Sequence, residues 1–247
     1  MEIINSRSMK IFPTKKENYW ISLSDIMTVL MVIFLFIAIT YMRQVRSEQE
    51  DRDRILIEYQ ETNIALYEIL LDEFEDDFSE NRWHAELGED LSIRFLNEEV
   101  LFDYNSVNLK TEFQNILSQF FPRYINILLD ERFRDKIAEV RIEGHTDSVG
   151  PYMYNVELSQ NRTANVLNFL FYRNNSEYAI LPAEDQKLMR YWFTTTGYSF
   201  GRTLDSAGEY SFYSNQPEDA DRSRRVEFRI VTKSEEVVNQ MLRLLND

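Results

Sequence analysis

The feature that most constrains this chain is one run of apolar residues near its start that carries a single carboxylate. Residues 20–42 read WISLSDIMTVLMVIFLFIAITYM, with Asp25 near the beginning. A helix of that length, rising about 1.5 Å per residue, spans the roughly 30 Å hydrocarbon core of a bilayer. A charged side chain inside a membrane span costs roughly 2.5–3.5 kcal/mol on insertion scales, so Asp25 is a candidate functional residue.

We interpret the run as an uncleaved membrane anchor and not as a signal peptide. The apolar region of a signal peptide is shorter, about 7–15 residues, and leads into a small-x-small cleavage site. Here the sequence TYMRQVRSE follows instead. Tyr19, Trp20 and Tyr41 lie at the ends of the run, where amphipathic aromatic side chains meet the membrane interface.

The basic residues around the run do not fix its orientation. They are Arg7, Lys10, Lys15 and Lys16 before it, and Arg43, Arg46, Arg52 and Arg54 after it. Because cytoplasmic flanks carry the excess of Lys and Arg, such a balance leaves the topology open. The orientation has to follow from what the rest of the chain binds.

Composition excludes several functions. The net charge of -15 at pH 7 argues against nucleic-acid binding, which needs a basic face. The absence of cysteine excludes disulfides, zinc–thiolate sites, a lipoprotein anchor and thiol nucleophiles. The two histidines, His84 and His145, lie far apart in the sequence, so we expect no metal site and no cofactor, and a hydrogen-bonded structural role for His145.

Residues 43–86 are expected to form a helical linker. The segment from Gln44 to Trp83 contains no Gly or Pro and is densely charged. A stripe recurs at spacings of four and three: Ile55, Tyr59, Thr62, Leu66 and Ile69. Such a stripe suits a single packed helix or a short coiled-coil seam between two copies, and both remain open. The acidic segment DEFEDDFSEN is expected to end the helix.

Beyond about residue 87 the pattern changes to short strands alternating with helices. The strand-like runs are LSIRF, EVRIEG, WFTTTGY and RRVEFRIV, and the helical ones are TEFQNILSQFFPRYINILLDERF and YNVELSQNRTANVLNFLFY. This order predicts an α/β two-layer sandwich around one core. Pro122 predicts a kink or break in the first long helix. Residues 174–191 are expected to form a loop and a short helix starting near Pro182, of unknown role.

The stretch GHTDSVGPYMYNVELSQNR, residues 144–162, is the most informative part of this region. Gly150 can supply a turn with positive φ, and Pro151 can open a helix at its first position. One face of that helix can therefore pack on the sheet while another stays accessible.

On this helix Asn155, Leu158 or Ser159, and Arg162 fall on one face. Asp147, just before the helix, is expected to lie near Arg162. An anion beside a bidentate cation is matched to a ligand that carries both an ammonium and a carboxylate group.

These residues resemble the OmpA-like peptidoglycan-binding domain, whose signature TD-x-x-G-x4-N-x-x-L-S-x-x-R runs here from Thr146 to Arg162. The resemblance extends over residues 87–231 and implies a βαβαββ-type fold for a domain of residues 87–247. It implies that VLFDYNSVNLK, from Val100, is the opening strand and loop, and that RSRRVEF leads into the closing strand. It also places the domain in the periplasm.

In that family, residues matching Asp147 and Arg162 hold the zwitterionic end of diaminopimelate in the peptide stem. The resemblance therefore implies a peptidoglycan-binding set of Thr146, Asp147, Gly150, Tyr154, Asn155, Leu158, Ser159 and Arg162. Tyr154 is expected to contact the ligand or to pack in the core.

The whole chain resembles the MotB class of ion-driven stator subunits: a short cytoplasmic tail (1–19), one span (20–42), a helical linker and an OmpA-like domain. WISLSDIMTVLMVIF matches the aromatic-x-x-x-x-D-hydrophobic-M-T pattern of that class, with Asp25 in the ion-carrying position. Its short tail and compact linker differ from flagellar MotB. Within the class the chain most resembles ZorB, the stator-like component of Zorya anti-phage defence systems.

This resemblance implies a non-enzymatic, single-pass inner-membrane protein with a cytoplasmic N-terminus. It implies a homodimer of this chain inside five copies of a ZorA-like multispan membrane protein, attached to peptidoglycan. Asp25 would take up an ion, with H⁺ preferred and Na⁺ left open by the sequence; a proton would let the carboxyl group cross the membrane in neutral form. Thr28, three residues on, lies on the same helical stripe and is expected to bond the carboxyl or to line the ion route.

Other functions remain to be weighed. A flagellar-type motility stator is one alternative. A passive peptidoglycan tether is another, which shares every domain but gives Asp25 no function. A wall-cleaving enzyme would use a pair of carboxylates. GYSFG fits the G-x-S-x-G pattern of hydrolases, but a loop-like segment follows it and both histidines precede Ser199, which argues against that activity.

Overall fold

The computed structural model describes residues 19–79, 82–103, 105–172 and 176–246. The expected tail, residues 1–19, lies outside this range except for Tyr19. The chain divides into two compact units, Met1–Asp53 and Arg54–Asp247, and each is described by itself.

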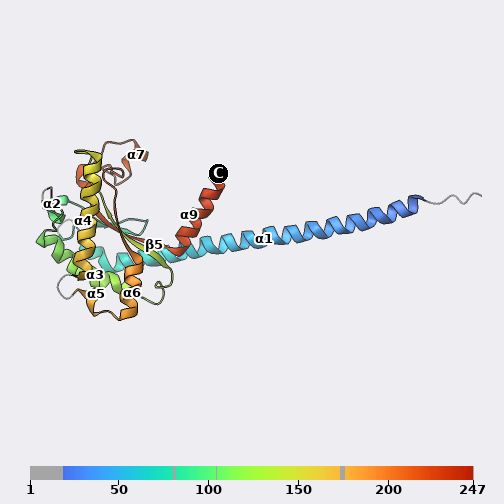
Figure 1. The fold of residues 1–247 in the computed structure, drawn as a ribbon, viewed down its shortest axis with the longest axis horizontal. Coiled ribbons are helices and arrows are strands. Elements are labelled where there is room, and N and C mark those ends of the chain that lie inside the picture. The colour runs from blue at the N-terminus through green and yellow to red at the C-terminus, as the bar shows by residue number, and fades with distance from the viewer. Residues whose placement is uncertain (1–18, 80–81, 104, 173–175, 247) are drawn as a thin grey trace, which may run out of the picture. The chain divides into compact units, whose positions relative to one another are not determined.

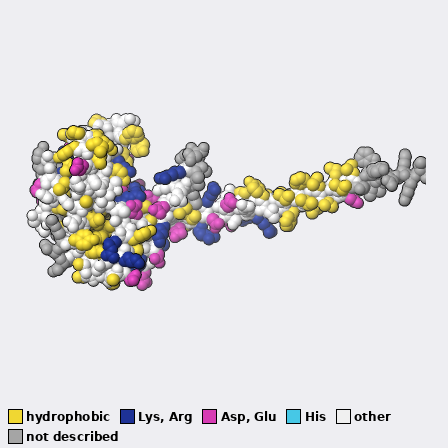
Figure 2. All heavy atoms as spheres, viewed as in Figure 1, with side chains coloured by type: hydrophobic (Ala, Val, Ile, Leu, Met, Phe, Trp, Pro, Cys, Tyr) yellow, Lys and Arg dark blue, Asp and Glu magenta, His cyan; other side chains and the backbone are white. Residues whose placement is uncertain are grey.

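Helix α1, Tyr19–Phe74, carries the apolar run in the first unit. Hydrophobic side chains are exposed along the run from Leu23 to Met42, with Met31 and Phe36 each 69% exposed, and they form the yellow surface of this segment in Figure 2. Within the described chain it is the one helix long and apolar enough to cross a membrane. Because water does not tolerate so much contiguous apolar surface, the expected membrane helix is confirmed.

The second unit includes the last turns of α1. Leu66, Leu70 and Phe74 are fully buried, and the ring of Phe74 lies 5.3 Å from that of Phe120. The predicted stripe therefore packs against its own domain. The helix ends inside the acidic segment as expected, followed by the short helix η1, Glu75–Asp77. The compact unit begins at Arg54, so the end of α1 supplies core residues to the domain expected over residues 87–247.

The described part of this unit forms a five-stranded sheet in the order β1-β2-β5-β3-β4. The strands are β1 (Ala85–Leu87), β2 (Ser92–Phe95), β3 (Ile137–Gly144), β4 (Phe193–Gly197) and β5 (Val226–Thr232). Strands β3 and β4 pair in parallel and all other pairs are antiparallel. Without β1, the chain order β2-α3-β3-α4-β4-β5 is the expected βαβαββ (Figure 1), where α3 is Thr111–Leu128 and α4 is Tyr152–Tyr172.

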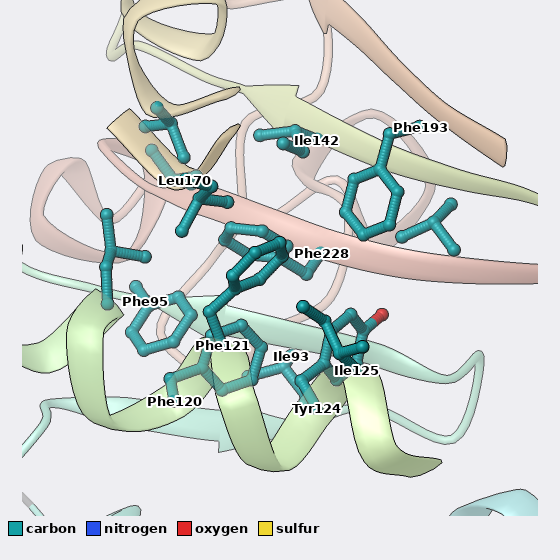
Figure 3. Close-up of a cluster of buried hydrophobic side chains, with 14 of the residues drawn as sticks. Ile93, Phe95, Phe120, Phe121, Tyr124, Ile125, Ile142, Leu170, Phe193 and Phe228 are labelled. Carbon is teal, nitrogen blue, oxygen red and sulfur yellow. The ribbon is translucent and has the colours of Figure 1, made fainter. Parts of the chain in front are cut away.

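One face of the sheet is apolar and packs on α3 and α4. Side chains alternate between the two faces of a strand, so Phe228 points to the core while Glu227 and Arg229 point away from it. The ring of Phe120 on α3 lies 5.2 Å from Phe95 and 5.1 Å from Phe228 (Figure 3). The two-layer α/β architecture is therefore confirmed.

Pro122 does not break α3. The helix runs through it to Leu128 because neighbouring side chains on both sides, Phe121 and Ile125 among them, are buried and hold the turn in place. Tertiary packing here outweighs the backbone hydrogen bond that proline removes.

The segment from Val100 is not the opening strand. Val100 lies in the short helix α2, Glu98–Leu101, and a single antiparallel bridge joins Phe102 to Leu109. The opening strand is β2, which carries LSIRF. Residues 102–103 and 105–109 instead belong to a loop, and residues 105–107 of it contact α4.

Five further helices complete the described chain: α5 (Glu177–Ile180), α6 (Ala183–Trp192), α7 (Ser211–Ser214), α8 (Ala220–Ser223) and α9 (Lys233–Asn246). Helix α6 starts directly after Pro182, as the sequence predicts.

Candidate functional site

Helix α4 approaches the ends of β3 and β4 because both strands end in glycine. A Cβ atom on Gly144 would lie 2.7 Å from the backbone oxygen of Ser159, and one on Gly197 would lie 2.6 Å from the Ser159 hydroxyl. That hydroxyl accepts a hydrogen bond from the Ser199 amide at 3.1 Å. The sequence motif is thereby fixed at one end of the sheet.

The turn before α4 has the predicted geometry. Gly150 has a φ of 93°, and Asn155 Nδ2 donates to the Val149 carbonyl at 2.9 Å. The Tyr154 hydroxyl donates to Asn105 Oδ1 in the facing loop, and Leu158 is half-buried. Asn155 and Tyr154 therefore hold the walls of the site in place.

A narrow hollow lies beside this turn. It is lined by Leu101, Phe102, Gly144, His145, Arg162, Arg224, Arg225 and Val226. Arg162 is only 4% exposed; its Nε donates to the Ser106 carbonyl at 2.9 Å and its guanidinium lies 4.6 Å from the Phe102 ring centroid. Three arginines line the hollow, two of them paired with Asp147 and Glu227, and it has no free space for a water molecule, so a ligand carboxylate can reach these arginines only if side chains of the lining move.

Asp147, which the sequence places near Arg162, forms its ion pair with Arg224. Asp147 Oδ2 accepts from Arg224 Nη1 at 2.8 Å, while its Oδ1 accepts from the Val149 amide at 3.1 Å. Arg162 instead reaches towards the 102–109 loop. Arg224 connects the two, since it pairs with Asp147 and lines the same hollow as Arg162.

The predicted binding residues thus divide into two groups. Arg162 lines the hollow and Asp147 lies next to it through Arg224. The others shape the site: Thr146, for example, is buried and its amide donates to the Ser199 carbonyl at 3.0 Å. Sequence reasoning missed Arg224, although the arginine cluster in RSRRVEF was a visible signal for it.

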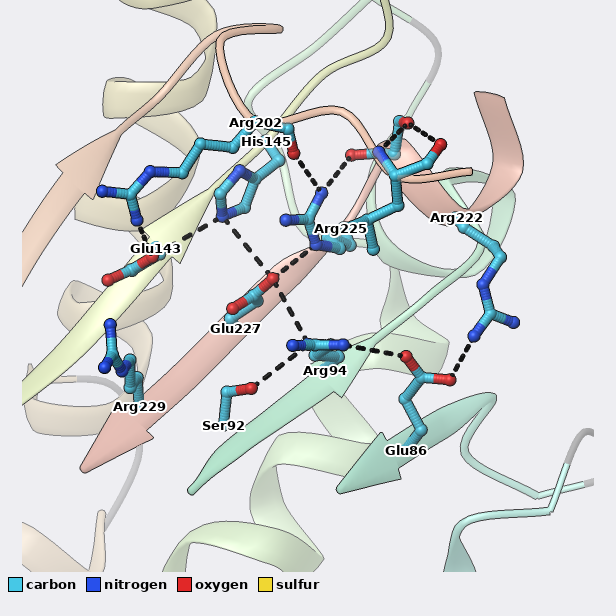
Figure 4. A network of polar contacts seen from close by, with 12 residues as sticks. Glu86, Ser92, Arg94, Glu143, His145, Arg202, Arg222, Arg225, Glu227 and Arg229 are labelled. Carbon is cyan, nitrogen blue, oxygen red and sulfur yellow. Dashed lines mark hydrogen bonds and ion pairs between the residues drawn. The ribbon is translucent and has the colours of Figure 1, made fainter. Parts of the chain in front are cut away.

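A buried ion-pair network adjoins the hollow (Figure 4). Glu143 and Glu227 are each 1% exposed. Arg225 Nε donates to Glu227 Oε1 at 2.5 Å, and Arg202 Nη1 donates to Glu143 Oε2 at 3.3 Å. Both carboxylates therefore have a countercharge from the chain itself, as buried charges require.

His145 lies between these carboxylates, with Nε2 at 3.8 Å from each. Neither ring nitrogen has a hydrogen-bond partner among the described residues, so the expected hydrogen-bonded role is wrong, and the ring instead stacks on Tyr198 at 5.3 Å. Burial, and next the charge of Arg225, lowers the pKa of His145 to about 3. The imidazole is therefore neutral near pH 7.

Ligand atoms of Glu143, His145 and Glu227 lie within 4.8 Å of one another, a spacing that could suit a metal ion. Both carboxylates are already paired with arginines, however, and those positive charges oppose a buried cation. The cluster has the chemistry of a structural network.

Ser199 of the GYSFG pattern is fully buried, and its hydroxyl donates to the Tyr152 carbonyl at 3.1 Å. The hydroxyl ties the loop after β4 to α4. This geometry gives Ser199 a structural role and not that of a nucleophile.

In the first unit, Asp25 lies on the exposed apolar part of α1. The Thr28 hydroxyl donates to the Ser24 carbonyl one turn earlier. The alternative in which Thr28 bonds the Asp25 carboxyl is therefore not what the structure shows.

Comparisons with known proteins found one matching family model and several similar structures. The OmpA family model matches residues 101–189, which defines the domain as OmpA-like. A solved structure of a MotB-like protein from Desulfovibrio vulgaris is 23% identical, with a TM-score of 0.47, and covers 70% of this chain and 96% of that one.

Two curated relatives extend the match to nearly the whole chain. Zorya protein ZorB of Escherichia coli strain ATCC 8739 is 36% identical over 94% of this chain and 97% of its own length. Zorya protein ZorB of Escherichia coli O139:H28 is 28% identical over 87% of this chain and 80% of its own length. The chain belongs to the ZorB family, as its resemblance to that family suggested.

Proposed function

We propose that this chain anchors an ion-driven, stator-like motor of the inner membrane to peptidoglycan, and that the motor acts in anti-phage defence with a ZorA-like multispan partner. The observation that carries the proposal is the combination of two sites in one ZorB-family chain. Asp25 lies on an exposed apolar helix, and Asp147 borders an arginine-lined hollow in an OmpA-like domain.

The hollow suits the zwitterionic end of diaminopimelate in a peptide stem. Arg162 and Arg224 bind its carboxylate, and Asp147 binds its ammonium group. The side chains of Arg224 and Asp147 are 26% and 14% exposed, so the pair can open to a ligand. A zwitterion supplies both opposite charges at once and leaves neither residue unpaired.

Asp25 carries the ion, with H⁺ preferred to Na⁺. A carboxylate surrounded by apolar side chains is costly when charged, and protonation removes that cost. The proton enters from the periplasm and leaves to the cytoplasm, and Thr28 lines its route. Because peptidoglycan is periplasmic, the N-terminus is cytoplasmic in this topology.

The motor consists of a dimer of this chain inside five ZorA-like subunits. The exposed apolar surface of α1 is available to such a partner as well as to lipid. Anchoring to the wall converts ion flow into torque, because an unanchored stator would turn with its load.

A wall-cleaving enzyme fits the domain less well. The glutamates of the buried network, Glu143 and Glu227, are paired with arginines and closed to a sugar substrate. A glycosidase needs two carboxyl groups that flank the bond to be cleaved. Glu143 and Glu227 are instead accounted for as structural ion pairs of a binding domain.

The first test is the composition of the complex. The chain, expressed with its native operon neighbours and extracted in mild detergent, is expected to co-purify with a multispan protein in a two-to-five ratio by native mass spectrometry. Recovery as a monomer or dimer alone would contradict the motor and leave only a wall tether.

A second test addresses the anchor. Asp147→Asn is expected to weaken co-sedimentation with peptidoglycan sacculi about 10- to 100-fold, since hydrogen bonds to charged groups contribute roughly 1.5–3 kcal/mol. Asp130→Asn is the matched control, because Asp130 also pairs with an arginine, Arg132 at 2.8 Å, but in another part of the domain. Equal binding of all three proteins would contradict the proposed site.

A further inference from the structure

A second hollow lies close to the first and is lined by different chemistry. It has a volume of about 340 Å³ and is lined by Gly201, Arg202, Thr203, Tyr210, Phe212, Tyr213 and Arg229. We call it the aromatic hollow. Phe212 and Tyr213 are 81% and 78% exposed, an unusual position for two large rings in water.

The loop that carries these rings is held in a defined conformation. The Ser211 amide donates to the Thr203 carbonyl at 3.0 Å, and the Tyr213 amide donates to the Tyr210 carbonyl at 2.9 Å. Leu204 and Tyr210 form an antiparallel bridge. The two rings pack edge to face, 5.2 Å apart, so they are presented together as one surface.

The arginines of the aromatic hollow are already balanced by carboxylates. Arg202 pairs with Glu143 and its guanidinium lies 3.7 Å from the Tyr198 ring centroid, while Arg229 Nη2 pairs with Glu235 Oε1 at 2.8 Å. The hollow therefore offers ring faces and hydrogen-bond donors without a large excess of positive charge. That combination fits a neutral ligand with apolar faces and polar edges, and it does not favour an anionic surface.

The two hollows are joined through one side chain. Arg225 lines the first hollow, and its Nη1 donates at 3.1 Å to the carbonyl of Arg202, which lines the second. The two hollows are therefore neighbours on the domain.

We propose that the aromatic hollow binds the glycan strand of peptidoglycan. The apolar faces of the sugar rings lie on Phe212 and Tyr213, and hydroxyl and N-acetyl groups bond to Arg202 and Tyr210. This inference rests on the proposed anchoring function, in which the first hollow takes the peptide stem of the same polymer.

The test uses the full-length chain in detergent and two separate probes. One is a soluble diaminopimelate-containing stem peptide without sugars, and the other is glycan strands freed of peptides by an amidase. The double variant Phe212→Ala, Tyr213→Ala is expected to bind the glycan strands about tenfold more weakly, which corresponds to about 1.4 kcal/mol. Its affinity for the stem peptide is expected to be unchanged.

Two controls make the result specific. Tyr191→Ala removes an aromatic ring that is 74% exposed on α6, outside both hollows, and is expected to leave both affinities unchanged. A Phe212→Trp, Tyr213→Trp variant keeps ring faces and is expected to retain glycan binding. An unchanged melting temperature in the alanine variant shows that the loop change has not unfolded the domain.

The possible outcomes separate this inference from the proposed function. Equal glycan binding by the wild type and the alanine variant overturns the inference. A wild type that binds the stem peptide but not the glycan strands also overturns it, and leaves the proposed anchor intact. A wild type that binds glycan strands through Phe212 and Tyr213 but ignores the stem peptide supports the aromatic hollow and contradicts the role given to the first.

Discussion

Two carboxylates in this molecule have opposite surroundings. Glu227 is buried in the domain and receives a hydrogen bond from Arg225. Asp25 lies on an exposed apolar helix, and none of the described residues forms an ion pair with its carboxylate. In the domain the chain supplies the countercharge itself. On the apolar helix the described residues supply none to Asp25, and in the proposed motor an ion neutralises it.

The comparison shows that burial alone does not mark a functional carboxylate. A buried ion pair whose partners come from one chain adds little net stability but is costly to break. A charged carboxylate in hydrocarbon costs free energy, and binding a proton or ion removes that cost. Ion binding at such a residue can therefore be coupled to a conformational change. The first arrangement stabilises the fold, and the second is the one that the proposed ion carrier requires.

The largest expected effect is that of Asp25→Asn, which keeps the shape of the side chain but cannot exchange a proton. Phage protection by the complete operon is expected to fall at least about 100-fold, the range for losing a proton-transfer group. Plating efficiency measures the effect, and membrane fractionation checks insertion. Glu48→Gln, in the charged part of α1, is the control. Full protection by an inserted Asp25→Asn protein would contradict the carrier role.

The second prediction tests the paired carboxylate. Arg225→Ala removes the hydrogen-bonded partner of buried Glu227 and leaves it only Arg94, at 3.6 Å, so it is expected to lower the free energy of unfolding by up to about 3–5 kcal/mol. Replacing both residues by apolar ones, Arg225→Met with Glu227→Leu, is expected to restore most of the loss. Arg132→Ala, which breaks a pair on a side chain 65% exposed, should cost no more than about 1 kcal/mol.

These unfolding measurements use urea titration followed by intrinsic fluorescence. If Arg225→Ala were no more destabilising than Arg132→Ala, the network would not depend on internal charge balance, and the contrast with Asp25 would lose its basis.

Much of the fold follows from the local sequence. The strands EVRIEG and RRVEFRIV were found because β-branched and apolar residues alternate with charged ones at the period of two that a half-buried strand imposes. Segments whose structure depends on distant contacts were not found. Pro122 stays in a helix because of core packing, and the residues around Val100 bend into a short helix and loop.

The site divides in the same way. The motif brings Asp147 and Arg162 to one end of the sheet, and this could be predicted because the two are only 15 positions apart along one turn and helix. Arg224 is separated from Asp147 by 77 residues, and only the pairing of β5 with β3 brings the two together. Long-range strand pairing leaves little trace in one sequence.

The third prediction concerns pH. The pKa of His145 is lowered to about 3 in the folded domain, whereas the ordinary value is 6.5, so the unfolded chain binds the proton more readily between these values. The contribution of His145 to the free energy of unfolding is fully present above pH 6.5. It is lost as the pH falls towards 3, by at most about 1.4 kcal/mol per pH unit. His145→Gln is expected to flatten the slope of melting temperature against pH, whereas His84→Gln is not. Identical slopes in all three proteins would show that His145 is not the group responsible.

The smallest effect is expected at Thr28, and it sharpens the contrast between the two carboxylates. Its hydroxyl bonds to the Ser24 carbonyl and not to Asp25, so Thr28→Val should reduce motor-dependent protection only about 2- to 10-fold, the equivalent of one net hydrogen bond of roughly 0.5–1.5 kcal/mol. Thr40→Val is a matched control, because the Thr40 hydroxyl makes the same kind of bond to the Phe36 carbonyl on the same helix, at 3.0 Å. Equal effects of the two variants would show that Thr28 contributes only to the helix and not to the ion route. A loss of protection as large as that of Asp25→Asn would mean that the Thr28 hydroxyl coordinates the ion itself. Asp25 would then share the ion with a residue of its own chain.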